Sequence, residues 1–364
     1  MEKKTFELIR DLSNAFGVSG FEDEVIRIAR DYAKGSVDHM DEDPIRNLYL
    51  YRETREEMDD PSDDRPVLML DAHSDEVGYM IQSIRDNGTM EMITVGGQIA
   101  SNIPATKVWI LAEDGKLVSG VVSSKPPHFT SAAERNKPLD ITELVIDIGA
   151  VSRKEVVEDF HIGPGCPAVP AVEFEYNEKN QVALGKGFDD RIGCAVVLEA
   201  LKRLSGKKLG TRVVGTLTSQ EEVGERGCIA ALEKVRPQIA ICIEGAPADD
   251  TFSPAYNIQN GLHKGPMLRY MDIGMITHPR FIRYAFSIAD ELGIPTQKAV
   301  RRGGGTNGGM IQNQTGAVPT IVISCPVRYT HSHQTFTALD DFEKVVELVC
   351  GILERLDGKV LASF

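Results

Sequence analysis

Two adjacent acidic residues, Glu221 and Glu222, follow a strand-like run at residues 211–218. Carboxylates placed side by side at the end of a strand can divide the work of metal-assisted hydrolysis. One oxygen donor holds a metal ion, and its neighbour takes a proton from the activated water. The chain also contains the other donors that such a site needs: His73, Asp75, Asp189, Asp190, Glu244 and His331. These residue types predict a hydrolase that uses two metal ions.

The predicted strands place these donors at one edge of a sheet. In open α/β sheets, ligands bind beyond the carboxyl ends of the strands. Four predicted strands end just before a donor or a pair of donors: residues 66–70 before His73 and Asp75, 211–218 before Glu221 and Glu222, 238–243 before Glu244, and 319–324 before His331. The sequence therefore predicts that the donors meet at this edge.

Each donor taken alone has a simpler interpretation. His73 could be a core histidine, Asp189 a helix cap, and Glu244 a surface acid after a strand. The convergence of two histidines and three carboxylates outweighs these interpretations. Mixed nitrogen and oxygen donors match divalent zinc, cobalt or manganese.

Helices and strands alternate along most of the chain. The predicted helices cover residues 3–16, 192–204, 228–235, 279–292 and 341–356, and the predicted strands are the four named above. A further helix is expected to begin at Ser19, because Ser19 and Glu22 are spaced as a capping box. This alternation predicts an α/β fold with a mostly parallel sheet covered by helices.

The pattern changes over residues 77–162. Alternating apolar and polar residues appear there, together with an Asn-Gly dipeptide at 87–88 and an Asp-Gly dipeptide at 114–115. Both dipeptides are strong signals of hairpin turns. We therefore predict an inserted all-β domain at 77–162, which interrupts a catalytic domain formed by residues 1–76 and 163–364.

Composition and charge argue against several other classes of protein. The 364 residues contain 40 Lys and Arg against 54 Asp and Glu, a net charge of −14, and no basic run is interleaved with aromatic residues. We therefore expect neither nucleic acid nor membranes as partners. There is no apolar stretch typical of a signal peptide or a membrane span, and the six cysteines lack C-x-x-C spacing. These features lead us to expect a cytoplasmic protein with reduced thiols.

Four sequence blocks resemble one family of peptidases. They are DAHSDEVG at residues 71–78, GFDDRIG at 187–193, SQEEVGERG at 219–227 and RYTHS at 328–332. With these blocks in order, the chain resembles the tetrahedral, or deblocking, aminopeptidases, which include bacterial glutamyl aminopeptidases. The resemblance implies a dinuclear metal domain interrupted by a barrel-like insert used in assembly. It also implies short peptides as substrates and a homo-oligomer, either a dimer or a dodecamer.

The resemblance further implies which donors hold metal. Asp189 would bridge two divalent ions, which we expect to be zinc or cobalt, with manganese as a further option. His73 and Glu244 would complete one metal site. Glu222 and His331 would complete the other.

The remaining two acids would handle protons and orientation. Glu221 would be the general base for the water between the ions, and would later protonate the leaving amine. Asp75 would hydrogen-bond the His73 imidazole and raise its basicity. The resemblance also implies a cis peptide between Asp189 and Asp190.

The chain departs from the family pattern at three positions. Glu244 stands where much of the family has aspartate. Asn307 and Thr335 stand where acidic residues are common. We expect the first change to affect metal preference, and the change at Asn307 to alter a polar contact near the substrate. We do not expect these changes to alter the reaction.

Three functions are compatible with the sequence. The leading hypothesis is a metal-dependent aminopeptidase. An N-acyl-amino-acid deacylase or another amide hydrolase could use the same dinuclear site, because pocket walls rather than metal ligands select the substrate. The third hypothesis is a non-catalytic scaffold on the same fold, and the presence of Glu221 and Asp75 argues against it.

Overall fold

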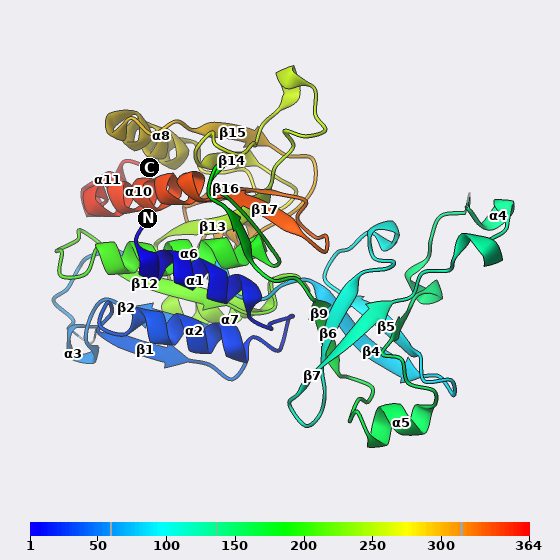
Figure 1. Cartoon of the computed structure of the whole chain (residues 1–364). Coiled ribbons are helices and arrows are strands. Elements are labelled where there is room, and N and C mark those ends of the chain that lie inside the picture. Colours follow the sequence, from blue (N-terminus) through cyan, green and yellow to red (C-terminus); the bar gives the residue numbers. More distant parts are fainter. Residues whose placement is uncertain (59, 136, 314–315) are drawn as a thin grey trace.

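The structure is a computed structural model that describes residues 1–58, 60–135, 137–313 and 316–364. The chain forms a large sheet covered by helices and a smaller closed barrel beside it (Figure 1). Both termini lie on the sheet body, and an internal segment forms the barrel. The predicted fold class, an α/β domain with a small all-β insert, is confirmed.

Four parallel strands form the centre of the sheet. They lie in the order β12 (Arg212–Thr218), β3 (Val67–His73), β13 (Ile239–Pro247) and β16 (Thr320–Arg328). Nearly all of their side chains are buried, as expected for apolar strands covered on both faces. The carboxyl ends of the four strands lie at the same edge of the sheet.

Antiparallel strands extend this centre on both sides, so the sheet is mixed. The order continues through β2 and β1 beyond β12, and through β17, β11 and β10 beyond β16, while β14 pairs with β15 and β16. Their bounds are β1 (His39–Glu42), β2 (Leu48–Tyr51), β10 (Glu175–Asn177), β11 (Val182–Gly185), β14 (Met267–Met271), β15 (Gln297–Val300) and β17 (Thr335–Ala338). Short connections such as residues 43–47 can join only antiparallel neighbours.

Helices cover both faces of the sheet. One face packs against α1 (Lys3–Asn14), α2 (Asp23–Ala33), α6 (Phe188–Arg203), α8 (Pro279–Leu292) and α10 (Leu339–Arg355), and the other against α7 (Arg226–Val235) and α9 (Asn307–Asn313). The short helices are α3 (Arg55–Met58), α4 (Ala132–Arg135), α5 (Arg153–Glu158) and α11 (Gly358–Ala362). No helix among the described residues is long and apolar enough to cross a membrane.

The inserted segment closes into a six-stranded barrel. Its strands pair in the order β4 (Gly78–Ile84), β5 (Met90–Val95), β8 (Val145–Asp147), β7 (Leu117–Val122), β6 (Lys107–Leu111) and β9 (Pro167–Pro170), and β9 returns to β4. The last strand lies beyond the predicted limit at residue 162. Prolines at both ends of β9 disguise it in the sequence, because proline usually argues against a strand.

The predicted capping box at Ser19 is wrong. Helix α2 begins at Asp23, and its N-cap residue Glu22 makes no side-chain capping hydrogen bond. The Ser19 hydroxyl instead donates to Asp75 Oδ2 at 2.5 Å. The buried Asp75 carboxylate needs donors, and this long-range contact replaces the local cap.

Helix α6 starts earlier than the predicted residue 192. It begins at Phe188, but Asp189 and Asp190 have non-helical backbone dihedrals within it. The peptide bond between these two residues is cis, as the family resemblance implied. Because of these dihedrals, the side chains of Asp189 and Asp190 do not have the relative directions of neighbouring residues in a regular helix.

A buried ionic cluster ties the start of the barrel segment to the sheet body. Glu76 Oε1 accepts hydrogen bonds from Lys186 Nζ at 2.6 Å and from Arg191 Nη2 at 3.2 Å. All three side chains are at most 3% exposed. Lys186 Nζ also donates to the carbonyl of Ala15 in the chain just after α1. One carboxylate therefore pairs with two buried cations.

Replacing Glu76 with alanine should destabilise the fold by about 3–5 kcal/mol, because it leaves buried charge without a partner. The control is Glu42→Ala, which removes partly exposed contacts with Arg30 and Arg46 and should cost about 0–1 kcal/mol. Urea unfolding at equal metal loading measures both changes. A loss for Glu76→Ala no larger than that of the control would contradict the role given to this cluster.

Candidate metal centre

The carboxyl edge of the central strands brings together the seven side chains predicted from the sequence to have a role in metal binding or proton transfer. His73 ends β3 and Asp75 follows it, Glu221 and Glu222 follow β12, Glu244 lies within β13, His331 follows β16, and Asp189 lies at the start of α6. A cavity of about 490 Å³ opens at this edge. Its walls include the Glu221, Glu222 and His331 side chains.

The Asp189 carboxylate lies between two imidazoles. Its Oδ1 is 3.3 Å from His73 Nε2, and its Oδ2 is 3.2 Å from His331 Nε2. A second carboxylate faces each ring. His73 Nε2 is 3.6 Å from Glu244 Oε1, and His331 Nε2 is 3.3 Å from Glu222 Oε1. The site thus has two halves that share Asp189.

Asp75 is fully buried and surrounded by donors. Its Oδ2 accepts from Ser19 Oγ at 2.5 Å and from the Glu222 backbone N–H at 3.2 Å, and its Oδ1 accepts from the Glu221 N–H at 3.0 Å. His73 Nδ1 lies 3.3 Å from Oδ1. Burial alone would raise the pKa of Asp75, but its contacts with His73 and the other donors lower it overall. An ionised Asp75 can hold the imidazole with Nε2 toward Asp189.

The barrel orients the second imidazole. His331 Nδ1 donates to the carbonyl oxygen of Gly97 at 2.7 Å, and Gly97 lies just after barrel strand β5. A carbonyl oxygen can only accept, so Nδ1 carries a hydrogen, and Nε2 is the ring nitrogen that could bind a cation beside Asp189 and Glu222. The two imidazoles are therefore oriented in the same sense by different parts of the chain.

Negative charge is crowded at this edge. Burial raises the pKa of Glu222 to about 8, and the Asp189 charge adds to the rise. Burial also raises the pKa of Glu244 to about 7, and it raises that of Glu221 well above its usual value. The pKa of Asp189 is lowered, because the two imidazoles outweigh its burial. Bound cations would favour the ionised form of the buried glutamates.

The donors fit two divalent cations. Three groups of ligand atoms lie within 4.8 Å of one another in the described part of the chain, and all three belong to this edge: His73 with Asp189 and Glu244, Asp189 with Glu222 and His331, and His73 with Glu221 and Glu222. Glu222 Oε1 is buried and has no hydrogen-bond partner among the described residues. Mixed nitrogen and oxygen donors suit zinc, cobalt or manganese.

Charges of both signs line the cavity beside the centre. Arg269 pairs with Asp272 at 2.8 Å, and Arg301 pairs with Asp249 at 2.8 Å. Glu225 lies in the same wall, and burial raises its pKa. Since acidic partners hold both guanidinium groups, the wall is polar rather than strongly basic.

We expected Asn307 to alter a polar contact near the substrate, but it does not line this cavity. It is buried behind the sheet edge, where its Nδ2 donates to Asp71 Oδ2 and to Thr218 Oγ1, both at 2.8 Å. Thr335 is also buried, and its hydroxyl donates to the Gly185 carbonyl at 3.1 Å. Both departures from the family pattern therefore act on the scaffold of the site.

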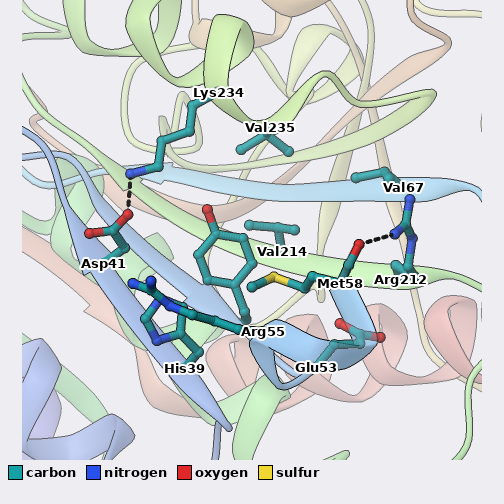
Figure 2. A pocket seen from close by; sticks show the side chains of 11 residues that line it. His39, Asp41, Glu53, Arg55, Met58, Val67, Arg212, Val214, Lys234 and Val235 are labelled. Carbon is teal, nitrogen blue, oxygen red and sulfur yellow. Dashed lines mark hydrogen bonds and ion pairs between the residues drawn. The ribbon is translucent and has the colours of Figure 1, made fainter. Parts of the chain in front are cut away.

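A second cavity, of about 440 Å³, lies elsewhere on the sheet body beside β1, β2 and α7 (Figure 2). Three of its charged side chains are held by one another or by backbone. Asp41 Oδ2 lies 2.5 Å from Lys234 Nζ, and Arg212 Nη1 donates to the Met58 carbonyl at 3.3 Å. None of the three ligand groups in the described part of the chain includes a residue of this cavity. It does not compete with the sheet edge as a metal centre.

Known proteins resemble this chain over most of its length. Residues 58–348 match the family model described as M42 glutamyl aminopeptidase. The glutamyl aminopeptidase of Lactococcus lactis subsp. cremoris is 28% identical over 363 residues, which cover 98% of each chain. The TET aminopeptidase of a marine-sediment Thaumarchaeota archaeon is 33% identical, with a TM-score of 0.92 over 99% of both chains. The Pyrococcus horikoshii TET1 peptidase, which can assemble into a tetrahedron or a large octahedral shell, is 28% identical, with a TM-score of 0.84 over 97% of this chain and 100% of that one.

Replacing Asp75 with asparagine should weaken cation binding at His73 by about 10- to 100-fold, because the amide no longer offers two acceptor oxygens to the surrounding donors. Competition with a coloured zinc chelator measures the affinity. The control is Asp41→Asn in the second cavity, which should leave cation binding unchanged. Equal affinities for native chain and Asp75→Asn would rule out this role of Asp75.

Proposed function

The chain belongs to the M42 glutamyl aminopeptidase family and is a peptide hydrolase, and we propose that it is a metal-dependent aminopeptidase that releases the N-terminal residues of short peptides. The observation that carries the proposal is the Asp189 carboxylate, each of whose oxygens faces an imidazole. The adjoining cavity gives the end of a peptide access to this carboxylate. Membership of a peptidase family overturns the hypothesis of a non-catalytic scaffold.

Five side chains would hold two divalent cations. Asp189 would contact both, His73 and Glu244 would complete one site, and Glu222 and His331 the other. Zinc and cobalt suit these donors, and manganese is a further option. The cations would polarise the scissile carbonyl and lower the pKa of the water between them.

Glu221 is proposed as the group that moves the proton. Its carboxylate lies at the cavity wall, and one of its oxygens is within 4.8 Å of a ring nitrogen of His73 and of a carboxylate oxygen of Glu222. From this position it would accept a proton from the attacking water and deliver it to the nitrogen of the leaving amine. The Glu221 backbone is held by its hydrogen bond to Asp75. Asp75 would therefore position both the base and the His73 ring.

The second candidate from the sequence, an N-acyl-amino-acid deacylase, would use the same centre. The two functions differ in whether the substrate presents a free amine or a blocked one. Relatives named as aminopeptidases, matched over nearly the whole chain, favour the free amine. The polar cavity wall, with Glu225 among its side chains, is also compatible with a charged amine.

We further propose that the protein is a cytoplasmic homo-oligomer. All six cysteines lie in the described residues and are free thiols, as expected in a reducing compartment. The assembly of the related Pyrococcus horikoshii peptidase supports association between copies. The proposed assembly domain is the inserted β domain, predicted at residues 77–162, together with β9, which closes its barrel. A dimer or a dodecamer is the proposed state.

Replacing Glu221 with glutamine should lower kcat on an aminoacyl-p-nitroanilide by about 10²- to 10⁴-fold, because the amide cannot accept the proton from water. Cation content, measured by elemental analysis, should stay at two per chain. The control is Glu233→Gln on the exposed face of α7, which should keep native turnover. Native kcat in the Glu221→Gln protein would exclude this residue as the base.

A substrate panel separates the two hydrolase functions. We expect the native protein to cleave peptides and p-nitroanilides with a free N-terminus, and to leave their N-acetylated counterparts intact. Removal of cations with a chelator should abolish the activity, and added zinc or cobalt should restore it. Faster cleavage of the acetylated substrates would favour the deacylase instead.

A further inference from the structure

The two halves of the metal centre are supported by different parts of the chain. His73 and Glu244 belong to the central strands, and the His73 ring faces Asp75 within the same body. The His331 ring is instead held by the carbonyl of Gly97, which belongs to the barrel segment. The second half of the centre is therefore completed by the inserted domain.

Gly96, next to Gly97, packs directly against the other ligand of that half. A Cβ atom at Gly96 would lie 3.2 Å from Glu222 Cβ, 3.3 Å from Glu222 Oε2 and 2.7 Å from Val77 Cγ1. The backbone at Gly96 has φ +81°, a value that residues other than glycine rarely adopt. Only glycine fits this position without displacing Val77, Glu222 or residues 96–98 themselves. We use "strap" for residues 96–98.

The strap is fixed to the barrel by a side chain that does not touch the centre. Gln98 Nε2 donates to the Gly78 carbonyl at 2.8 Å, and Tyr79 Oη donates to Gln98 Oε1 at 3.0 Å. Gly78 and Tyr79 begin strand β4. The position of the strap therefore follows the position of the barrel.

The barrel in turn packs on the sheet body beside the glutamates. One apolar cluster joins Val95 and Val169 of the barrel to Phe16 and Val18 of the sheet body, and Val223, next to Glu222, packs against it. Gly78 also approaches the sheet body closely, since a Cβ there would lie 2.9 Å from a Val18 methyl carbon. The strap and the Glu222 turn therefore both adjoin the contact between the barrel and the sheet body.

We propose that the strap is a positioning element for the cation held by Glu222 and His331, so that docking of the barrel controls occupancy of one metal site and leaves the site of His73 and Glu244 largely independent. This inference rests on the proposed dinuclear function. The Gly97 carbonyl fixes the hydrogen of His331 on Nδ1, and Gly96 sets the space in which the Glu222 carboxylate lies. Groups that orient a ligand in this way alter metal affinity without contacting the metal.

The experiment is a titration of the metal-free full chain with cobalt, followed by calorimetry and by the visible absorption of bound cobalt. For the native chain we expect two bound ions. For Gly96→Ala we expect one ion bound as in the native chain and the other weakened by about 10- to 100-fold. Gln98→Ala loosens the strap without placing an atom near Glu222, and a smaller weakening of the same ion should follow.

The matched control is Gly115→Ala in the turn between β6 and β7. Gly115 has φ +82°, almost the value at Gly96, and a Cβ there would meet no atom within 4 Å. It therefore introduces the same backbone strain into the same barrel, away from the centre, and cobalt binding should match the native chain. Thermal unfolding of each metal-free variant separates loss of folding from loss of a site.

Native binding of both ions by Gly96→Ala and Gln98→Ala, equal weakening of both ions, or an equal effect of Gly115→Ala would each overturn the inference. In all three cases the native chain still binds two ions, so the proposed function survives. A native chain that binds fewer than two ions would overturn the proposed dinuclear function and this inference together.

Discussion

The interaction on which the rest of the site depends is the contact of one buried carboxylate, Asp189, with two imidazoles. Each oxygen of Asp189 serves one ring, and each ring faces one further glutamate. Buried carboxylates crowded in this way are costly unless positive charge compensates them. Two divalent cations would supply that charge, and at the same place they would polarise the substrate carbonyl and activate a water molecule.

The fold makes these contacts possible because it brings separate chain segments together at one edge of the sheet. Four parallel strands deliver His73, the Glu221 and Glu222 pair, Glu244 and the His331 turn to the same side of the sheet. The first turn of helix α6 supplies Asp189. Glu76, in the segment that leads into the barrel, fixes the start of that helix through its contacts with Lys186 and Arg191. The barrel then returns to the edge through the strap and holds the last ligand.

Most of the central framework could be predicted from the sequence. The strand at 211–218 and the helix at 279–292 match β12 and α8 nearly residue for residue, because apolar runs and helical periodicity are local signals. The position of the ligands relative to strand ends followed from the same signals. What could not be predicted depends on contacts between distant segments: Ser19 has the spacing of a helix cap but bonds Asp75, and Gly96 and Gly97 have the composition of an ordinary turn. Strand β9 was hidden by its prolines, which lie at its two ends, where the missing N–H groups disrupt the ladder least.

Anomalous diffraction from crystals of the zinc-loaded protein tests the central claim most directly. We expect two peaks per chain, one beside His73 and one beside His331, each at about 2.0–2.2 Å from a different oxygen of the Asp189 carboxylate. A single peak, or two peaks of which either lies out of reach of Asp189, would contradict the account.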